Sequence, residues 1–262
     1  MTIRLVVVGG GRMGEALVGG LVGSGWAEVA ELCVVEKVAA RRDELAARFP
    51  GLSVVDEVPA AQGVVVAVKP GDVDGACREV AAAGLDRALS IAAGIPLAAL
   101  EAALGPVAVV RAMPNTAALV GAGAAAIAAG ARAGEDDLAW AEEILGALGE
   151  VVRVPEAMLD AVTGLSGSGP AYVFLVAEAL IDAGALVGLP HDVSRRLALQ
   201  TLLGAARLLT ESGETPQALR AAVTSPGGTT AAGLRALEAA GVRSAVMEAV
   251  VAATERSRQL GS

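Results

Sequence analysis

The fold is decided by the stretch Leu5-Val6-Val7-Val8-Gly9-Gly10-Gly11-Arg12-Met13-Gly14, near the start of a chain of 262 residues. Its apolar run has the length of a buried strand, and the glycines after it let the chain turn sharply. Residues 12–21 then have the apolar pattern of a helix. Strand, glycine turn and helix in this order predict the first βα unit of a parallel sheet.

Short β-branched runs alternate with Ala-rich helical patterns from residue 1 to about residue 155. This alternation predicts an α/β fold with a mainly parallel sheet that helices cover on both faces. The expected strands are residues 5–8, 32–35, 52–55, 64–68, 88–91 and 107–111. Residues 122–128 and 150–154 could extend the sheet around a helix at 135–148.

The strand signals stop after Pro155, and long helical patterns take their place. They cover residues 171–186, 192–211, 216–223, 229–240 and 243–259. Leucines occupy more than one face of the second of these helices, which a small monomeric bundle could hardly bury. We therefore predict two domains, residues 1–155 with the sheet and residues 156–262 all helical, and a homodimer formed through the helical domain.

The composition limits the classes of function. The formal net charge of −9 repels a polyphosphate backbone, and no basic stripe with interleaved aromatic residues is present, which argues against nucleic acid. The amino-terminal apolar run is too short for a signal peptide. The uncharged stretch 112–131 contains a proline and several glycines, so it would be a poor membrane span. We expect a cytoplasmic protein that binds no nucleic acid and no membrane.

The two cysteines point to no metal site. Cys33 and Cys77 lie far apart in the chain, without the spacing to histidine or to another cysteine that metal and redox motifs have. We expect both to be buried core thiols.

The pattern GxGxxG spans Gly9 to Gly14, directly after a strand and at the start of a helix. Glycines in this position let the backbone approach a pyrophosphate while the helix N-terminus faces its charge. We therefore favour a Rossmann-type dinucleotide site over a chance glycine turn. Its expected residues from this turn are Gly9, Gly11, Arg12, Met13 and Gly14.

Glu36, at the end of the second strand, bears on the choice of cofactor. A carboxylate there accepts both ribose hydroxyls of NAD and repels the 2′-phosphate of NADP, which favours NADH. Lys37, Arg41 and Arg42 argue for NADPH, because they are close enough in sequence to bind that phosphate if Glu36 turns away. The two arginines could equally form a solvated helix face. The sequence leaves NADPH and NADH both open, with Glu36 and Lys37 among the expected cofactor residues.

Three further loops follow predicted strands, at the carboxyl edge where open α/β sheets bind ligands. They are Ala67-Val68-Lys69-Pro70, Ala92-Ala93-Gly94 and Arg111-Ala112-Met113-Pro114-Asn115-Thr116. We expect the first two to line the cofactor, and Met113 and Asn115 to lie near the nicotinamide. Lys69 could instead be a plain surface lysine, and Pro-Asn is also ordinary turn chemistry.

A polar bend, Thr224-Ser225-Pro226-Gly227-Gly228-Thr229-Thr230, interrupts the helical half. If buried, its hydroxyls, glycines and following helix start can direct donors at one small anion such as a carboxylate. The alternative is a tight turn that only joins two helices. As a substrate site the bend would use Ser225, Gly227, Gly228, Thr229 and Thr230.

The residue types that the motifs lack limit the type of reaction that the chain can catalyse. Ser166 and Ser168 lack the glycine spacing of a nucleophile elbow, and His191, the only histidine, follows a proline at a helix start, so a hydrolase is disfavoured. Lys37 and Lys69 are the only lysines, so the helical half offers no ammonium group for alcohol oxidation. A protonated imine already attracts hydride and needs only positioning and one weak hydrogen bond.

These motifs, in this order and spacing, resemble those of pyrroline-5-carboxylate reductases along the whole chain. The blocks that carry the resemblance are Gly9-x-Gly11-x-Met13-Gly14, Ala67-Val68-Lys69-Pro70, Ala92-Ala93-Gly94, Arg111-Ala112-Met113-Pro114-Asn115-Thr116, Thr163-Gly164-Leu165-Ser166-Gly167-Ser168-Gly169-Pro170-Ala171-Tyr172 and Thr224-Ser225-Pro226-Gly227-Gly228-Thr229-Thr230. The last two together are highly specific. The resemblance implies a Rossmann domain and a helical domain that interleaves with a second subunit. It also implies that the dimers often assemble further, five at a time, into decameric rings.

The resemblance also implies NAD(P)H-dependent reduction of 1-pyrroline-5-carboxylate, a cyclic imino acid, to L-proline. In the family's pattern the loop from Ser225 to Thr230 holds the substrate carboxylate, and the Thr230 hydroxyl, the expected catalytic group, contacts the ring nitrogen. Three positions depart from the pattern. Ala117 replaces the usual Pro, Gly71 replaces a polar residue, and Glu36-Lys37 differs from the neighbourhoods common in NADPH-preferring members.

Two rival hypotheses remain. One is a non-catalytic dinucleotide-sensing protein whose helical half serves only to oligomerise. The other is a related imine or hydroxyacid reductase with another substrate, although the hydroxyl-rich bend and the absence of lysine argue against a hydroxyacid.

Overall fold

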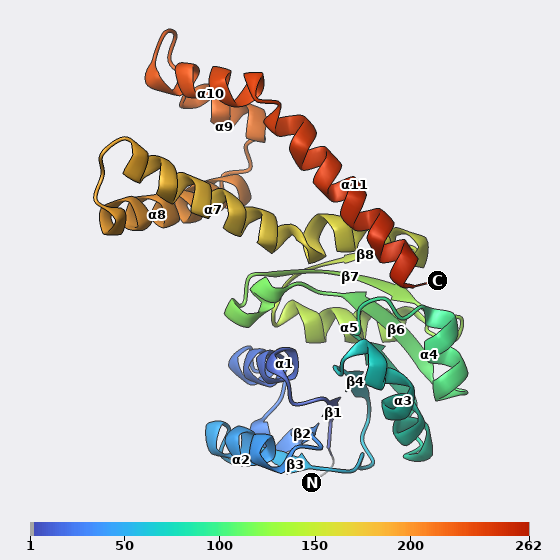
Figure 1. Cartoon of the computed structure of the whole chain (residues 1–262). Helices are drawn as coiled ribbons and strands as arrows, with labels where there is room; N and C mark the ends of the chain where they lie inside the picture. The colour runs from blue at the N-terminus through green and yellow to red at the C-terminus, as the bar shows by residue number, and fades with distance from the viewer. Residues whose placement is uncertain (1–2, 262) are drawn as a thin grey trace. The chain divides into compact units, whose positions relative to one another are not determined.

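The computed structural model describes residues 3–261 and divides the chain into two compact units (Figure 1). The sheet unit comprises the residues up to Ser168 together with those from Val251 onward, and the helical unit is Gly169–Val250. The last strand ends at Arg153 and only helical elements follow it. The predicted change from strands to helices near residue 155 is therefore present, whereas packing keeps residues 156–168 with the sheet.

The strands of the described residues form one eight-stranded sheet in the order β3-β2-β1-β4-β5-β6-β7-β8. They are β1 (Leu5–Val8), β2 (Leu32–Val35), β3 (Ser53–Val55), β4 (Val64–Val66), β5 (Arg87–Ser90), β6 (Ala108–Met113), β7 (Gly123–Ala129) and β8 (Gly149–Arg153). All neighbours run parallel except β6 and β7, which are antiparallel. The predicted mainly parallel sheet is confirmed.

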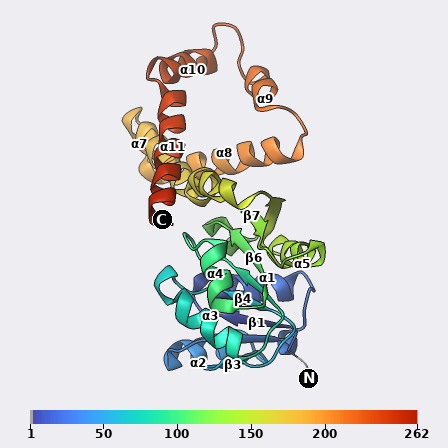
Figure 2. The same ribbon diagram turned by 90° about the vertical axis from the view of Figure 1, so that its right-hand side faces the viewer.

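Helices cover both faces of this sheet. The helices of the sheet unit are α1 (Arg12–Gly23), α2 (Ala39–Arg48), α3 (Val73–Ala82), α4 (Leu97–Leu104), α5 (Glu135–Gly146) and α6 (Leu159–Val162), with short turns η1 (Val29–Glu31), η2 (Pro70–Asp72), η3 (Thr116–Val120), η4 (Glu156–Met158) and η5 (Thr163–Gly167). Side chains alternate across β1, because successive strand residues point to opposite faces. Leu5 and Val7 join the core cluster of α1 and α5, whereas Val6 and Val8 join that of α3 and α4. Figure 2 shows these two helix pairs on opposite sides of the sheet.

Two strands, β4 and β6, end two residues away from the position that the sequence predicts. The expected strand 64–68 stops at Val66, because Lys69 already precedes the turn η2, which begins with Pro70. Proline fixes a backbone angle suited to that turn and offers no N–H for a ladder. The expected strand 107–111 instead continues to Met113, because its antiparallel pairing with β7 extends that far. Non-local pairing, which no local pattern encodes, sets that end.

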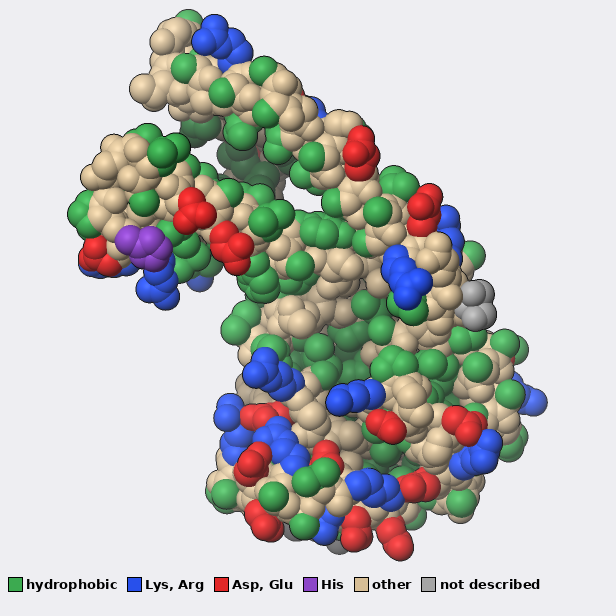
Figure 3. Space-filling model, viewed as in Figure 1, with side chains coloured by type: hydrophobic (Ala, Val, Ile, Leu, Met, Phe, Trp, Pro, Cys, Tyr) green, Lys and Arg blue, Asp and Glu red, His purple; other side chains and the backbone are tan. Residues whose placement is uncertain are grey.

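The helical unit contains α7 (Gly169–Leu186), α8 (His191–Glu211), α9 (Pro216–Ala222) and α10 (Thr229–Ala239), and α11 (Val242–Leu260) begins in it. These bounds lie close to the predicted helices. Large apolar side chains are exposed along them; among them are Val173, Phe174, Leu175, Leu197, Leu203, Leu208, Val246 and Met247. On the face drawn in Figure 3, hydrophobic side chains are common over this unit and charged ones are sparse. A surface of this kind marks a site of association.

One continuous helical stretch, Glu156–Leu186, is long and apolar enough to cross a membrane by length and composition alone. Its apolar side chains are largely exposed in the single chain. Length and composition do not distinguish a membrane span from a helix whose apolar face packs against another protein chain.

Two glycines of helix α1, one packed closely and one not, allow the packing of this helix to be tested. A Cβ added at Gly20 would lie 2.5 Å from Leu148 Cδ2 and 3.0 Å from the Ala147 carbonyl oxygen, whereas one at Gly23 meets nothing within 4 Å. We expect Gly20→Ala to lower the free energy of unfolding by about 1–2 kcal/mol, since overpacking outweighs the gain in helix propensity. Gly23→Ala should raise it by about 0.5 kcal/mol. Urea unfolding measures both, and equal effects of the two substitutions would contradict the packing.

Candidate active site

The three glycines of the motif each have a separate geometric role. Gly9 has a φ of 110°, and a Cβ there would lie 2.6 Å from the Ala67 carbonyl oxygen. A Cβ at Gly14 would lie 2.0 Å from the Gly9 carbonyl oxygen, so α1 packs directly on the turn. A Cβ at Gly11 meets nothing within 4 Å, which leaves the backbone there open to a ligand. These are the tight turn, the close helix packing and the open approach that a bound pyrophosphate requires.

The start of α1 has donors free for that pyrophosphate. Gly11 is the N-cap residue, and no side chain caps the helix. The first N–H groups of a helix have no partner within the helix, and the helix dipole places positive potential there. The residues present therefore fit the pyrophosphate of a dinucleotide.

Two cavities adjoin this turn and share Ala67 and Val68 as a wall. The larger, of about 690 Å³, has charged side chains in its lining. Predicted cofactor residues that line it are Gly9, Gly11, Glu36, Lys37, Ala67, Val68 and Lys69. The smaller, of about 270 Å³, is lined from the predicted set by Met13, Ala67, Val68, Ala92, Ala93, Met113 and Asn115. Most of the predicted cofactor residues are thus brought together.

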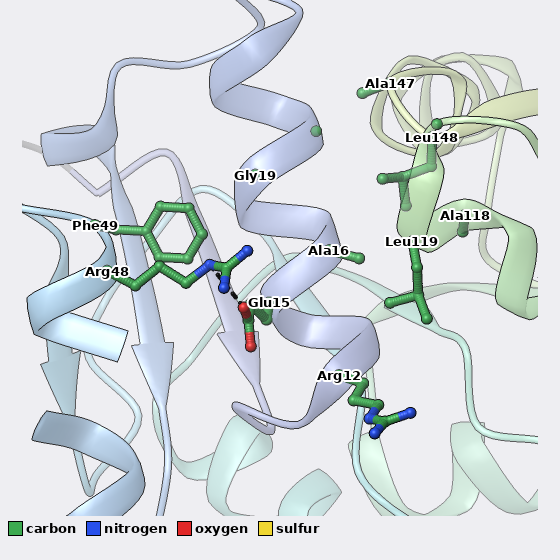
Figure 4. Close-up of a pocket in the computed structure, with 12 residues that line it drawn as sticks. Arg12, Glu15, Ala16, Gly19, Arg48, Phe49, Ala118, Leu119, Ala147 and Leu148 are labelled. Atoms are coloured by element: carbon green, nitrogen blue, oxygen red, sulfur yellow. Dashed lines mark ion pairs between the residues drawn. The ribbon is translucent and has the colours of Figure 1, made fainter. Parts of the chain in front are cut away.

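Four predicted residues lie outside these two cavities. Gly14 is buried under the turn, Pro70 starts η2, and Gly94 has a φ of 77° in the loop before α4. Arg12 lines a third cavity of about 420 Å³ beside α1 (Figure 4). In that cavity Arg48 is paired with Glu15 at 2.8 Å, and Arg12 points away from the pair.

The smaller cavity has a neutral lining. It consists of Met13, Ala67, Val68, Ile91, Ala92, Ala93, Met113, Pro114, Asn115, Thr116 and Gly167, none of which carries an ionisable side chain. A site with this lining can position a flat ring and exclude charge, but it supplies no general base. Alcohol oxidation would require such a base, whereas hydride addition to an iminium would not.

The side chain of Asn115 links elements of the cavity wall through hydrogen bonds. Its side-chain amide donates to the Ser166 carbonyl at 3.0 Å, and its oxygen accepts from the N–H groups of Ala117 and Ala124, both at 3.2 Å. The amide thus joins η3, β7 and η5 around the cavity. Ala117 donates one of these bonds, which a proline at that position could not do because it has no N–H.

The block around Ser166 forms a feature that the sequence did not predict. Residues Thr163–Gly167 form a π-helix, a widened turn that is common at functional sites. A Cβ on Gly167 would lie 2.6 Å from Met113 Cε, so the backbone closes the cavity here. The Ser166 hydroxyl donates to the Val162 carbonyl at 3.1 Å, one helical turn earlier in the chain.

Glu156 is a further structural residue that sequence patterns missed. Its carboxylate accepts from Arg111 at 2.8 Å and from the Leu97 N–H, the first of α4, at 2.6 Å. Arg111 lies on β6 ahead of Met113, and α4 follows the Ala92–Gly94 loop. Glu156 therefore ties two walls of the smaller cavity together. No local signal marks it, because its partners are 45 and 59 positions away.

Both cysteines are buried and reduced, as predicted. Burial raises the pKa of Cys33, and burial with the nearby Asp74 carboxylate raises the pKa of Cys77 to about 11. Neither thiol is activated. Among residues 3–261, no three His, Cys, Asp or Glu side chains are grouped to hold a metal ion.

The predicted substrate bend connects α9 to α10 in the helical unit. Gly227 has a φ of 70°, Gly228 is the N-cap of α10 without a side-chain cap, and the Gly228 N–H donates to the Ser225 carbonyl at 3.1 Å. A Cβ at Gly228 would lie 2.3 Å from Ser225 Oγ, so a larger residue there would require the serine side chain to rotate away. The helix N-terminus is thus open to an anion, with Thr229 and Thr230 in its first turn.

The bend is exposed in the single chain, so one copy does not provide the burial that a substrate site here would require. Ser225, Gly227 and Thr229 are exposed, and Gly228 and Thr230 are intermediate. The neighbouring Val223 is also exposed. Since the single chain leaves this apolar surface uncovered, burial of the bend depends on contacts that one copy of the unit does not provide.

Comparison with known proteins agrees with the geometry. The model of the pyrroline-5-carboxylate reductase dimerisation domain matches residues 156–260, and that of NADP oxidoreductase, coenzyme F420-dependent, matches residues 4–94. The pyrroline-5-carboxylate reductase of Synechocystis sp. is 46% identical, with 100% of this chain and 99% of the relative covered. The chain belongs to the pyrroline-5-carboxylate reductase family.

Solved structures of reductases in this family share the fold. That of Coxiella burnetii is 34% identical with a TM-score of 0.94, over 100% of both chains. That of Plasmodium falciparum, which carries bound NADP, is 30% identical with a TM-score of 0.84, over 99% of this chain and 98% of the other.

The hydrogen bonds of Glu156 to Arg111 and to the Leu97 N–H lead to a prediction about stability. Glu156→Ala leaves the largely buried Arg111 without its carboxylate and the Leu97 N–H without an acceptor, so we expect a loss of about 2–3 kcal/mol in the free energy of unfolding. Glu156→Gln, which keeps an acceptor, should cost less. Glu150→Ala, an exposed site on β8, is the control. Urea unfolding measures the free energy of unfolding of each variant. Equal values for Glu156→Ala and Glu150→Ala would rule out the role of Glu156 in holding Arg111 and Leu97.

Proposed function

We propose that the chain reduces the imine of 1-pyrroline-5-carboxylate to L-proline with NAD(P)H, at the smaller cavity of the sheet unit. The observation that carries the proposal is the neutral lining of that cavity beside a complete pyrophosphate turn. A protonated imine needs no base to accept hydride, whereas an alcohol substrate does. The family likeness over the whole chain supports the same reaction.

The chain's own residues would bind and orient the reactants. The turn from Gly9 to Gly14 and the start of α1 would hold the pyrophosphate, and Ala92 and Ala93 leave room for a flat ring. A reduced dinucleotide bound here would supply hydride chemistry: hydride addition to the imine carbon would move the C=N electron pair to nitrogen and give the secondary amine of proline. The apolar side chains of Met13 and Met113 in the lining would lower the polarity around this step.

We infer that the bend between α9 and α10 holds the substrate carboxylate. Its open helix N-terminus and the hydroxyls of Ser225, Thr229 and Thr230 are donors to an anion. Hydrogen bonds to a charged group contribute about 1.5–3 kcal/mol each, so two or three suffice without a cation. We assign to the Thr230 hydroxyl the contact with the ring nitrogen.

The apolar surface of the helical unit supports association of two copies, as does the match to the dimerisation model. We propose a homodimer, with a decamer of five dimers as its further assembly, in the cytoplasm. The stretch Glu156–Leu186 carries Glu178 and Asp182 in α7, charges that are costly in a lipid core. We therefore assign its apolar face to a second copy of the chain and not to a membrane.

The function is tested by turnover. Purified protein should oxidise NAD(P)H when 1-pyrroline-5-carboxylate is added and not when hydroxyacids or ketoacids are added. Thr230→Val should lower kcat/KM by about 10-fold to 100-fold, the effect of one hydrogen bond to a charged group, with dinucleotide affinity unchanged. Thr210→Val, whose hydroxyl bonds only to carbonyls of its own helix, is the control. No turnover with either cofactor would favour the rival dinucleotide sensor.

The association surface is tested by a charge on α7. Phe174 is 61% exposed in the single chain, and we expect Phe174→Glu to produce monomers, because burying a carboxylate in an apolar interface is costly. Val152→Glu, on the exposed edge strand β8, should leave the dimer intact. Light scattering coupled to size-exclusion chromatography measures the mass. If the mass of Phe174→Glu is unchanged, the dimer interface does not include Phe174.

A further inference from the structure

The orientation of Glu36 is fixed by the backbone. One carboxylate oxygen accepts from the Gly10 N–H at 3.1 Å, and the other accepts from the Val38 N–H at 2.9 Å. Turning Glu36 away would leave both N–H groups without a partner, which is unfavourable near the protein interior. Each oxygen keeps a further lone pair, so the carboxylate can still accept two hydroxyl groups.

The three cations that follow Glu36 in the sequence, Lys37, Arg41 and Arg42, are already engaged. Lys37 donates to the Asp56 carbonyl and pairs with Glu79, both at 2.8 Å. Arg42 donates to the carbonyls of Glu36 and Lys37 at 2.9 and 3.0 Å.

Arg41 is engaged most fully. It donates to the Gly10 carbonyl and to Glu44, both at 2.8 Å, and is also paired with Glu15. The bonds to Glu44 and Glu15 raise the pKa of Arg41. A 2′-phosphate would have to displace these carboxylates from the guanidinium.

The wall of the larger cavity is net acidic. Its ionisable lining residues are Glu36, Lys37, Lys69, Asp72 and Glu79, three carboxylates against two ammonium groups, and Glu79 is paired with Lys37. A ligand that adds a doubly charged phosphate here meets repulsion in a partly enclosed space.

From these contacts we infer that the chain selects NADH over NADPH, with Glu36 accepting the adenosine ribose hydroxyls and rejecting the 2′-phosphate. The inference rests on the proposed function for the role of the dinucleotide as hydride donor. It settles a choice that Lys37, Arg41 and Arg42 leave open in the sequence.

The test compares two ligands that carry no nicotinamide, ADP-ribose and 2′-phospho-ADP-ribose, by isothermal titration calorimetry on the full chain. We expect ADP-ribose to bind at least about tenfold more tightly, the effect of one unfavourable charge contact of about 1.4 kcal/mol. In Glu36→Gln this ratio should fall at least about fivefold. Glu57→Gln removes the same charge from an exposed residue that lines neither cavity, and the ratio should not change.

A second variant tests the inference even if Glu36→Gln does not fold. Glu79→Gln releases Lys37 from its ion pair at a largely exposed site, so 2′-phospho-ADP-ribose should gain about threefold in affinity relative to ADP-ribose. Equal or tighter binding of 2′-phospho-ADP-ribose to the wild type would overturn the inference, as would equal responses of Glu36→Gln and Glu57→Gln.

Turnover separates this inference from the proposed function. Initial rates with 1-pyrroline-5-carboxylate that are higher with NADPH than with NADH at equal concentrations would overturn the cofactor choice and leave the reaction standing. A preference for ADP-ribose without any turnover would instead overturn the reaction, and with it the role of NADH as hydride donor.

Discussion

The site depends on one close approach of backbone to backbone, that of helix α1 on the turn after β1. Gly14 lies so near the Gly9 carbonyl that no side chain fits between them. This contact directs the open N-terminus of α1 at the space beside Gly11. The larger cavity is lined by Gly9 and Gly11 of this turn, and the smaller by Met13 in the first turn of α1, so a pyrophosphate held at this point would have a cavity on either side.

The two cavities that share Ala67 and Val68 have opposite chemistry. The larger has five ionisable side chains in its lining, three of them acidic. The smaller has no ionisable lining and is bordered by the π-helix, to which the side-chain amide of Asn115 donates a hydrogen bond. A charged recognition end beside a neutral reaction end suits a dinucleotide that is bound by its adenosine half and reacts at its nicotinamide half.

The helical unit has a different relation to function. Its exposed apolar side chains and its exposed bend both indicate surfaces that the single chain does not cover. An imino acid carboxylate held by helix N–H groups and hydroxyls would gain strength from burial, because hydrogen bonds are stronger in a low dielectric. Association and substrate binding are therefore expected to depend on the same unit.

The sequence by itself determined the elements and most of the candidate site. Runs of β-branched residues, the glycine turn and the helical periods are local patterns, and they placed the strands and helices within a few residues. They also predicted that Gly9, Glu36, Ala92 and Met113 lie near one edge of the sheet, because the carboxyl ends of parallel strands meet there. Gly9 and Glu36 line the larger cavity, and Ala92 and Met113 line the smaller one.

Only the tertiary structure decided which side chains hold one another. Glu156 reaches Arg111 and Leu97 across 45 and 59 positions, Lys37 meets Glu79, and Arg12 faces a cavity apart from the other motif residues. The ends of β4 and β6 and the π-helix were likewise set by packing. Ion pairs and hydrogen bonds act over a few ångströms of space, and the fold, not the spacing along the chain, brings their partners within that range.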